Sequence, residues 1–277
     1  MLFVTIGPRR YRIDRPWGDL PEGQGGVTDV ATDPAGRIYV GLRRDAYVSA
    51  PAPTVIVLDA EGRRIGAFGE EVADLHMLDV SPDGLVHAVD RDAHEIIGFD
   101  AEGVARRRLG RRHHAGQPFN APCDIAFAPD GTAFVADGYA ASRVHVFGPD
   151  GAPRDGWGGP GQRAGEFSTP HAVWVGPRGE VAVADRENNR LEVFDQSGRH
   201  RRSITLLHKP MAVTADSKGN WWVTDQVPSL SVFSPEGLLV GRARAVLNGA
   251  HGMALHPDGS VLLAEMTPSR LTRLVPV

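Results

Sequence analysis

The sequence has few of the features that mark secreted, membrane-spanning or nucleic-acid-binding proteins. Its 277 residues include one cysteine, Cys123, which excludes an internal disulfide framework and a cysteine-based zinc site. Apolar runs are short, such as Leu2 to Ile6, and no charged leader is followed by an apolar core. The net charge of −4 gives no general reason to expect nucleic acid. We therefore expect a cytoplasmic protein without a membrane segment.

What the chain has instead is a repeat rich in glycine turns. A short apolar strand, a turn ending in glycine and a second apolar strand recur six times. The turn glycines are Gly36, Gly84, Gly131, Gly179, Gly219 and Gly259, at spacings of 48, 47, 48, 40 and 40 residues. A second turn follows in most units between strands that alternate apolar and polar residues. This period is typical of four-stranded propeller blades, and no sustained helical periodicity competes with it.

The sixth unit lacks its outer strand. The chain ends after VLLAE and SRLTRLVPV, whereas Phe3 to Asp14, continuing to Trp17, has the pattern of an outer strand. An N-terminal strand that completes the last blade would remove an open sheet edge. We therefore predict an all-β fold over residues 1–277, a single six-bladed β-propeller domain closed by its N-terminal strand.

One column of the repeat carries histidines in alternate blades. Eight positions before the turn glycine stand Thr28, His76, Cys123, His171, Met211 and His251. Alternate blades of a six-fold ring are related by about 120°, so three imidazoles would converge on the axis from three sides. Such convergence is how three-histidine zinc sites are built. The alternative is that the three are polar residues facing a water-filled channel.

A second column follows the second strand of each unit. Seven residues after the turn glycine it holds Arg43, Arg91 and Arg186, and one residue earlier stand Asp90, Asp137, Asp185, Asp225 and Glu265. We expect the acidic residues to accept hydrogen bonds from turn amides. The arginines could hold a substrate carboxylate or form salt bridges with a neighbouring blade. Tyr139 could reach the same face, where a phenol beside a metal can act as a general base.

The chain resembles the peptidyl-α-hydroxyglycine α-amidating lyase family within the NHL-type propellers. The resemblance covers about Thr28 to Glu265. It is carried best by PFNAPCDIAFAPDGTAFVADGYAASR (Pro118 to Arg143) and GEFSTPHAVWVGPRGEVAVADRENNR (Gly165 to Arg190). The DGY-x-x-SR and PH-x(13)-ADREN motifs are more distinctive than the bare turn pattern.

The resemblance implies roles for particular residues. The family's zinc histidines fall on His76, His171 and His251, its active-site tyrosine on Tyr139, and its two substrate-side arginines on Arg43 and Arg186. The backbone carbonyls of a structural calcium site fall on Val30 and Leu78. The acidic calcium ligand that follows the third histidine in the family is Gly252 here, so the resemblance implies at most a weaker calcium site.

Three functions are compatible with these residues. The first is a zinc lyase that cleaves the C–N bond of an N-acyl-α-hydroxyglycine-like substrate to an amide and glyoxylate. The second is a zinc hydrolase or hydratase acting on a small carboxylate at the same site. The third is a non-catalytic NHL platform for protein or RNA, for which Arg106 to Arg108, Arg111, Arg112 and Arg199 to Arg202 could form a basic patch. For an enzyme we expect a monomer with a small-molecule carboxylate substrate.

Overall fold

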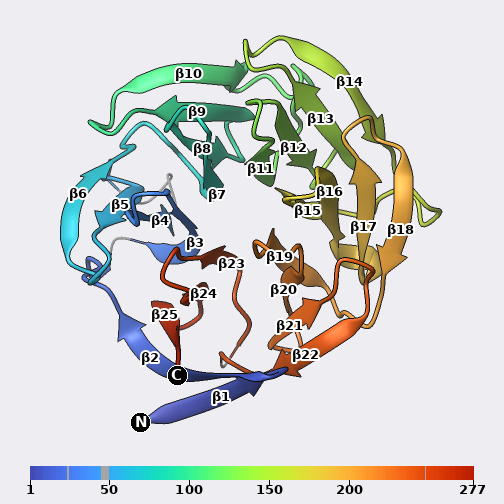
Figure 1. The fold of residues 1–277 in the computed structure, drawn as a ribbon. Helices are drawn as coiled ribbons and strands as arrows, with labels where there is room; N and C mark the ends of the chain where they lie inside the picture. The colour runs from blue at the N-terminus through green and yellow to red at the C-terminus, as the bar shows by residue number, and fades with distance from the viewer. Residues whose placement is uncertain (24, 45–49, 247) are drawn as a thin grey trace.

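The computed structural model arranges six antiparallel sheets in a ring around a central axis (Figure 1). It describes residues 1–23, 25–44, 50–246 and 248–277. None of the helices among these residues is long and apolar enough to cross a bilayer.

Each of the first five blades is built from four consecutive strands, the first of which lies nearest the axis in Figure 1. Blade one holds β3 (Gly26–Thr32), β4 (Ile38–Arg43), β5 (Val55–Leu58) and β6 (Arg64–Phe68). Blade two holds β7 (Leu75–Val80), β8 (Val86–Asp90), β9 (Glu95–Phe99) and β10 (Ala105–Gly110). Blade three holds β11 (Asp124–Phe127), β12 (Ala133–Asp137), β13 (Arg143–Phe147) and β14 (Pro153–Gly158). Blade four holds β15 (Pro170–Val175), β16 (Glu180–Asp185), the 3-10 turn η1 (Arg186–Asn188), β17 (Arg190–Asp195) and β18 (His200–Ile204). Blade five holds β19 (Pro210–Ala215), β20 (Trp221–Asp225), β21 (Ser229–Phe233) and β22 (Leu239–Ala243).

The sixth blade joins the two ends of the chain, which confirms the predicted closure. Its sheet runs in the order β1-β2-β25-β24-β23. The C-terminal strands are β23 (Gly252–Leu255), β24 (Val261–Met266) and β25 (Ser269–Pro276), and the N-terminal strands are β1 (Leu2–Ile6) and β2 (Arg9–Trp17). β2 takes the place of the missing outer strand and pairs with β25, with Tyr11 opposite Pro276 and Trp17 opposite Leu271. β1 is an additional fifth strand, which the repeat did not predict.

The turn glycines have the conformation that the repeat requires. All six have φ between +76° and +87°, a region that side chains disfavour and glycine enters freely. Each closes its turn by donating its N–H to the carbonyl three residues earlier, as Gly36 does to Asp33 at 3.0 Å.

Burial falls from the middle of each blade to its rim. All five residues of β12 are buried, whereas β10 alternates between buried or half-buried and exposed positions. Apolar side chains from neighbouring blades pack into shared clusters, such as the one that joins Tyr39 of blade one to Phe99 of blade two. These clusters hold the inner ends of the strands in place, and the candidate site is built on those ends.

Candidate metal centre

The acidic column fixes the segment that leads into each inner strand. Asp90 accepts the backbone N–H groups of Ala73 and Asp74 at 2.8 and 3.0 Å, and Asp185 accepts that of Ser168 at 2.7 Å. Asp137 and Asp225 likewise accept hydrogen bonds from the backbone N–H groups of Asn120 and His208, so the expectation is confirmed for the four aspartates. Glu265 instead accepts hydrogen bonds from the side chains of Arg270 and Thr272. The result is a rigid approach to the position where each inner strand begins.

Three histidines of alternate blades meet on the axis at those positions. His76 lies in β7 and His171 in β15, while His251 directly precedes β23. Their candidate ligand nitrogens lie within 4.8 Å of one another, and each pair of rings has its centroids 4.9 Å apart. His76 and His171 are fully buried and His251 is 8% exposed. The structure thus brings together the whole histidine column, in an arrangement in which one cation could contact all three rings.

Each imidazole is oriented by a backbone carbonyl of the next blade. Nδ1 of His76, His171 and His251 lies 2.8, 2.7 and 2.9 Å from the carbonyl oxygens of Cys123, Met211 and Thr28 respectively. A carbonyl only accepts, so Nδ1 carries the hydrogen and Nε2 keeps its lone pair. Nε2 of His171 is buried and has no hydrogen-bond partner among the described residues. A buried nitrogen left in this state fits a metal ligand.

The surroundings keep these imidazoles neutral. Burial holds the pKa of His76 and of His171 well below the ordinary value of 6.5, and the neighbouring histidines lower both further. Burial lowers the pKa of His251 to about 4, and the charges of Arg43, Arg186 and Arg91 act in the same direction. Neutral imidazole is the form that binds divalent metals. At neutral pH a metal would therefore displace no proton from these rings.

Tyr139 stands directly beside the histidines. It follows β12 by two residues and is 38% exposed. Its hydroxyl lies 3.0 Å from Nε2 of His76, and Nη1 of Arg186 donates to the same oxygen at 3.4 Å. The guanidinium of Arg186 lies 5.3 Å from the centre of the tyrosine ring. A phenol, a cation and the candidate metal ligands thus face one small volume.

Arg43 lies on this face but is engaged by an acid. Its Nε and Nη2 donate to the two oxygens of Asp74 at 2.6 and 3.2 Å. Asp74 belongs to the segment that leads into blade two, so the alternative of a salt bridge to a neighbouring blade is the arrangement found here. Arg186 has an ion pair with Glu187 at 3.0 Å but also reaches Tyr139. Of the two predicted arginines, only Arg186 is in contact with the tyrosine.

Two further residues lie on this face: Arg91, to which the family resemblance gave no role, and Asp74, which the sequence did not indicate. The guanidinium of Arg91 lies 5.2 Å from the centre of the Tyr139 ring, and its Nη2 lies 2.8 Å from Asp74. The available signal for Arg91 was its place in the same column as Arg43 and Arg186. Asp74 stands two residues before His76 but outside the repeat, so no column identified it.

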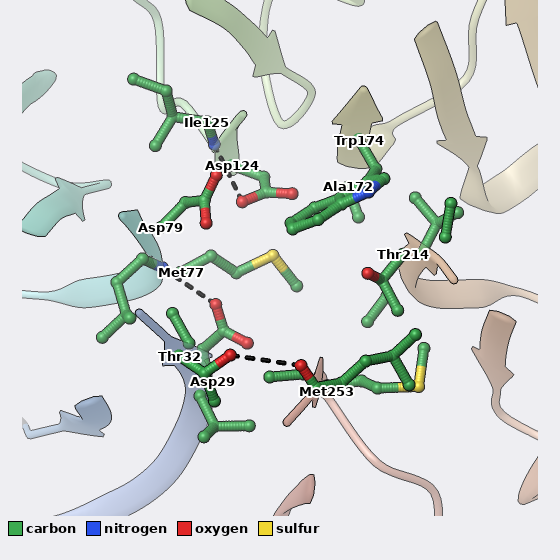
Figure 2. A pocket seen from close by; sticks show the side chains of 18 residues that line it. Asp29, Thr32, Met77, Asp79, Asp124, Ile125, Ala172, Trp174, Thr214 and Met253 are labelled. Atoms are coloured by element: carbon green, nitrogen blue, oxygen red, sulfur yellow. Dashed lines mark hydrogen bonds between the residues drawn. The ribbon is translucent and has the colours of Figure 1, made fainter. Parts of the chain in front are cut away.

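Beyond the histidines, the inner strands enclose a second cavity of about 190 Å³, which contains Val30 and Leu78. Figure 2 shows the carboxyl groups of Asp29, Asp79 and Asp124 around it. Burial raises the pKa of Asp29 to about 7 and that of Asp79 to about 8. Val30 and Leu78, the predicted calcium positions, therefore lie in a cavity apart from Tyr139 and the arginines.

The residues near Val30 and Leu78 fit calcium poorly. A Cβ placed on Gly252 would lie 1.9 Å from Oδ1 of Asp29, so Asp29 occupies the space that an acidic side chain at position 252 would need. The Asp29 carboxylate accepts backbone N–H groups from Leu78, at 2.9 Å, and from Val30 and Met253. Its oxygens are therefore already satisfied by donors, and Gly252 offers no side-chain ligand.

The fold and the site define the class of this protein, a six-bladed β-propeller with a three-histidine candidate metal centre. The NHL repeat family model matches residues 167–194. Peptidylglycine α-amidating monooxygenase of Rattus norvegicus is 33% identical over 154 residues, which cover 51% of this chain and 16% of the rat protein. A probable peptidyl-α-hydroxyglycine α-amidating lyase of Caenorhabditis elegans is 25% identical over 244 residues, covering 80% of this chain and 69% of that one.

These matches confirm the resemblance: the chain is a propeller with one segment matching the NHL repeat, and it is similar in sequence to the peptidylglycine α-amidating enzymes. The aligned part covers about a sixth of the rat protein's length. Among solved structures, a gluconolactonase of Xanthomonas campestris superposes with a TM-score of 0.75 at 16% identity, covering 96% of this chain and 90% of that one. At that identity the likeness concerns the fold alone.

Proposed function

We propose that this protein is a zinc-dependent lyase that cleaves the C–N bond of an N-acyl-α-hydroxyglycine-like substrate, giving an amide and glyoxylate. The observation that carries the proposal is the contact of Tyr139 with both His76 and Arg186 at a cluster of three buried, neutral histidines. His76, His171 and His251 would hold the zinc. When bound there, zinc supplies Lewis acidity, which favours loss of the proton from a hydroxyl group.

The chain's own residues account for the proton transfer. The reaction forms a carbonyl from the α-hydroxyl, breaks the bond to the amide nitrogen, and moves one proton from that oxygen to that nitrogen. In its phenolate form Tyr139 would accept this proton on its oxygen, and the resulting phenol would return it to the leaving nitrogen. The Arg186 guanidinium, 3.4 Å from this oxygen, stabilises negative charge that develops on it during the transfer.

The substrate carboxylate is assigned to the arginines of the same face. Arg186 is mostly buried, with 16% of its side chain exposed, so its orientation is restricted before substrate binds. Arg43 contributes from blade one, where its contacts with Asp74 leave Nη1 without a partner among the described residues. Together they would bind a carboxylate through charge-assisted hydrogen bonds.

The alternative of an RNA-binding platform is disfavoured by the pairing of the surface arginines. Arg106 contacts Asp100, Arg107 contacts Asp83, and Arg108 contacts Glu71 and Glu95. In the second basic run, Arg201 contacts Asp195 and Arg202 contacts Glu180. These acids neutralise much of the charge that would attract phosphates.

The direct test is to incubate the zinc-loaded protein with N-benzoyl-α-hydroxyglycine and to measure glyoxylate. We expect release above the uncatalysed rate, and a loss of at least about tenfold in Tyr139→Phe and in Arg186→Ala. Tyr11→Phe and Arg106→Ala, which lie away from the site, serve as matched controls and should retain full activity. Glyoxylate at background level with this and several related acyl-hydroxyglycines would favour the hydrolase or hydratase alternative.

A further inference from the structure

A pocket of about 530 Å³ lies next to the metal centre, between blades one and two. Its lining includes Arg43, Arg44, Arg91, Asp74 and Asp92. Met266 lines both this pocket and a smaller one that contains His251, so the two adjoin. The larger pocket is within the size range of small-molecule sites. Among its described lining residues three arginines outnumber two aspartates, so these residues carry a net positive charge.

Two of these arginines converge on a single carboxylate. Oδ2 of Asp74 accepts a hydrogen bond from Nη2 of Arg43 at 3.2 Å and lies 2.8 Å from Nη2 of Arg91. Asp74 itself is 6% exposed and is held by the N–H contact with Asp90. Arg91 also donates through Nε to Asp92 at 2.8 Å. Two guanidinium groups are thereby fixed side by side, each with Nη1 left free of contacts from the described part of the chain.

The third arginine is buried and has no acid paired with it among the described residues. Arg44 is 9% exposed, and its terminal nitrogens donate to the carbonyl oxygens of Ala50, Glu70 and Val72. Within the ranges that the structure describes, no carboxylate pairs with it and its Nε has no partner. A buried charge is costly unless a counter-charge accompanies it. Arg44 therefore contributes positive charge to this side of the pocket.

We propose that this pocket is a second anion subsite, so that the preferred substrate carries a carboxylate on its acyl side in addition to the α-carboxylate. This inference rests on the proposed lyase function for the orientation of the substrate. Arg186, Arg43 and Tyr139 meet the reacting end, and Arg91, with the charge of Arg44 behind it, meets the distal anion. The ligand class is an N-acylglycine with a short dicarboxylic acyl group.

Binding of ground-state analogues tests the subsite independently of catalysis. The zinc-loaded protein is titrated calorimetrically with N-succinylglycine and with N-succinamoylglycine, a neutral analogue of nearly the same shape. We expect the charged analogue to bind at least about tenfold more tightly, the factor that one charge-assisted hydrogen bond supplies. In Arg91→Gln this preference should fall below about threefold, while Arg91→Lys retains part of it. Arg106→Gln, on an outer strand, should leave the preference unchanged.

Two results would overturn the subsite. One is equal affinity of the wild-type protein for the two analogues, and the other is a full preference retained in Arg91→Gln. The glyoxylate assay separates this outcome from the fate of the lyase proposal. Release of glyoxylate without any preference for the charged analogue would retain the lyase and remove the subsite. A preference without glyoxylate release would retain the subsite and remove the lyase.

Discussion

Binding of zinc to the three histidines should stabilise the folded ring in a concentration-dependent way. A ligand that binds only the folded state raises the free energy of unfolding by about 1.4 kcal/mol for each tenfold increase in free ligand above its Kd. A chain of 277 residues has an unfolding entropy of roughly 0.6 kcal/mol per kelvin near its Tm. Each decade of free zinc should therefore raise the Tm by about 2 °C.

Variants of two buried histidines test whether zinc binds at the three-histidine cluster. His171→Ala removes a ligand whose Nε2 has no partner among the described residues, so the Tm of this variant should no longer respond to zinc. His87 is equally buried, its Nε2 is also unpartnered within the described chain, and it lies in β8 outside the cluster. His87→Ala should lower the starting Tm but keep the zinc-dependent slope. Thermal melts followed by circular dichroism at four buffered zinc concentrations measure both quantities. A slope that survives in His171→Ala, or a wild-type Tm that does not change with zinc, would refute the assignment.

Two further predictions concern the ring. Tyr11 of β2 is 1% exposed and packs edge to face on Trp222 of blade five, with centroids 6.4 Å apart. Tyr11→Ala should therefore lower the free energy of unfolding, measured in urea, by about 3–5 kcal/mol. Leu2→Ala, at a half-exposed site on β1, should change it by less than about 0.5 kcal/mol. Similar losses in both variants would contradict the closure role of β2. Burial raises the pKa of Asp79 from 3.8 to about 8, so the folded state binds its proton more tightly than the unfolded state does. The protonated Asp79 therefore contributes fully to the free energy of unfolding below pH 3.8, and this contribution is lost as the pH rises towards 8. In calcium-free buffer, Asp79→Asn should reduce the fall of the unfolding free energy with pH by up to about 1 kcal/mol per pH unit. An unchanged pH profile in Asp79→Asn would show that the group does not titrate in this range.

The parts of the structure that repeat were the parts that the sequence could predict. Turn glycines at a regular spacing identify equivalent positions in every blade, so His76, His171 and His251 could be placed around one axis before any coordinates. Residues outside the repeat have no equivalent positions in the other blades, so their place in the fold cannot be inferred in this way. Asp74 lies in a connecting segment, and its pairing with both Arg43 and Arg91 depends on how two blades meet.

The fifth strand and the second cavity were missed for a related reason. β1 adds to a blade that already has four strands, and its sequence alone does not say which edge it joins. Asp29 fills the space beside Gly252 because blade one meets blade six at that point. Contacts between the first and last blades join residues more than 200 positions apart, where periodicity carries no information about side-chain packing.

The three histidines come from the even-numbered blades, and the carbonyl groups that orient them come from the odd-numbered blades. Even blades must supply an imidazole, and a single substitution there removes it. Odd blades supply only the main-chain oxygens of Thr28, Cys123 and Met211, a group that no side-chain substitution deletes. Three residues with different side chains therefore perform one task through the main chain, although the Thr28 hydroxyl also donates to the carbonyl oxygen of His76 at 2.7 Å. An engineer who wished to reshape the site beside the histidines could therefore vary the side chains of Cys123 and Met211 and keep the carbonyl groups that orient His76 and His171.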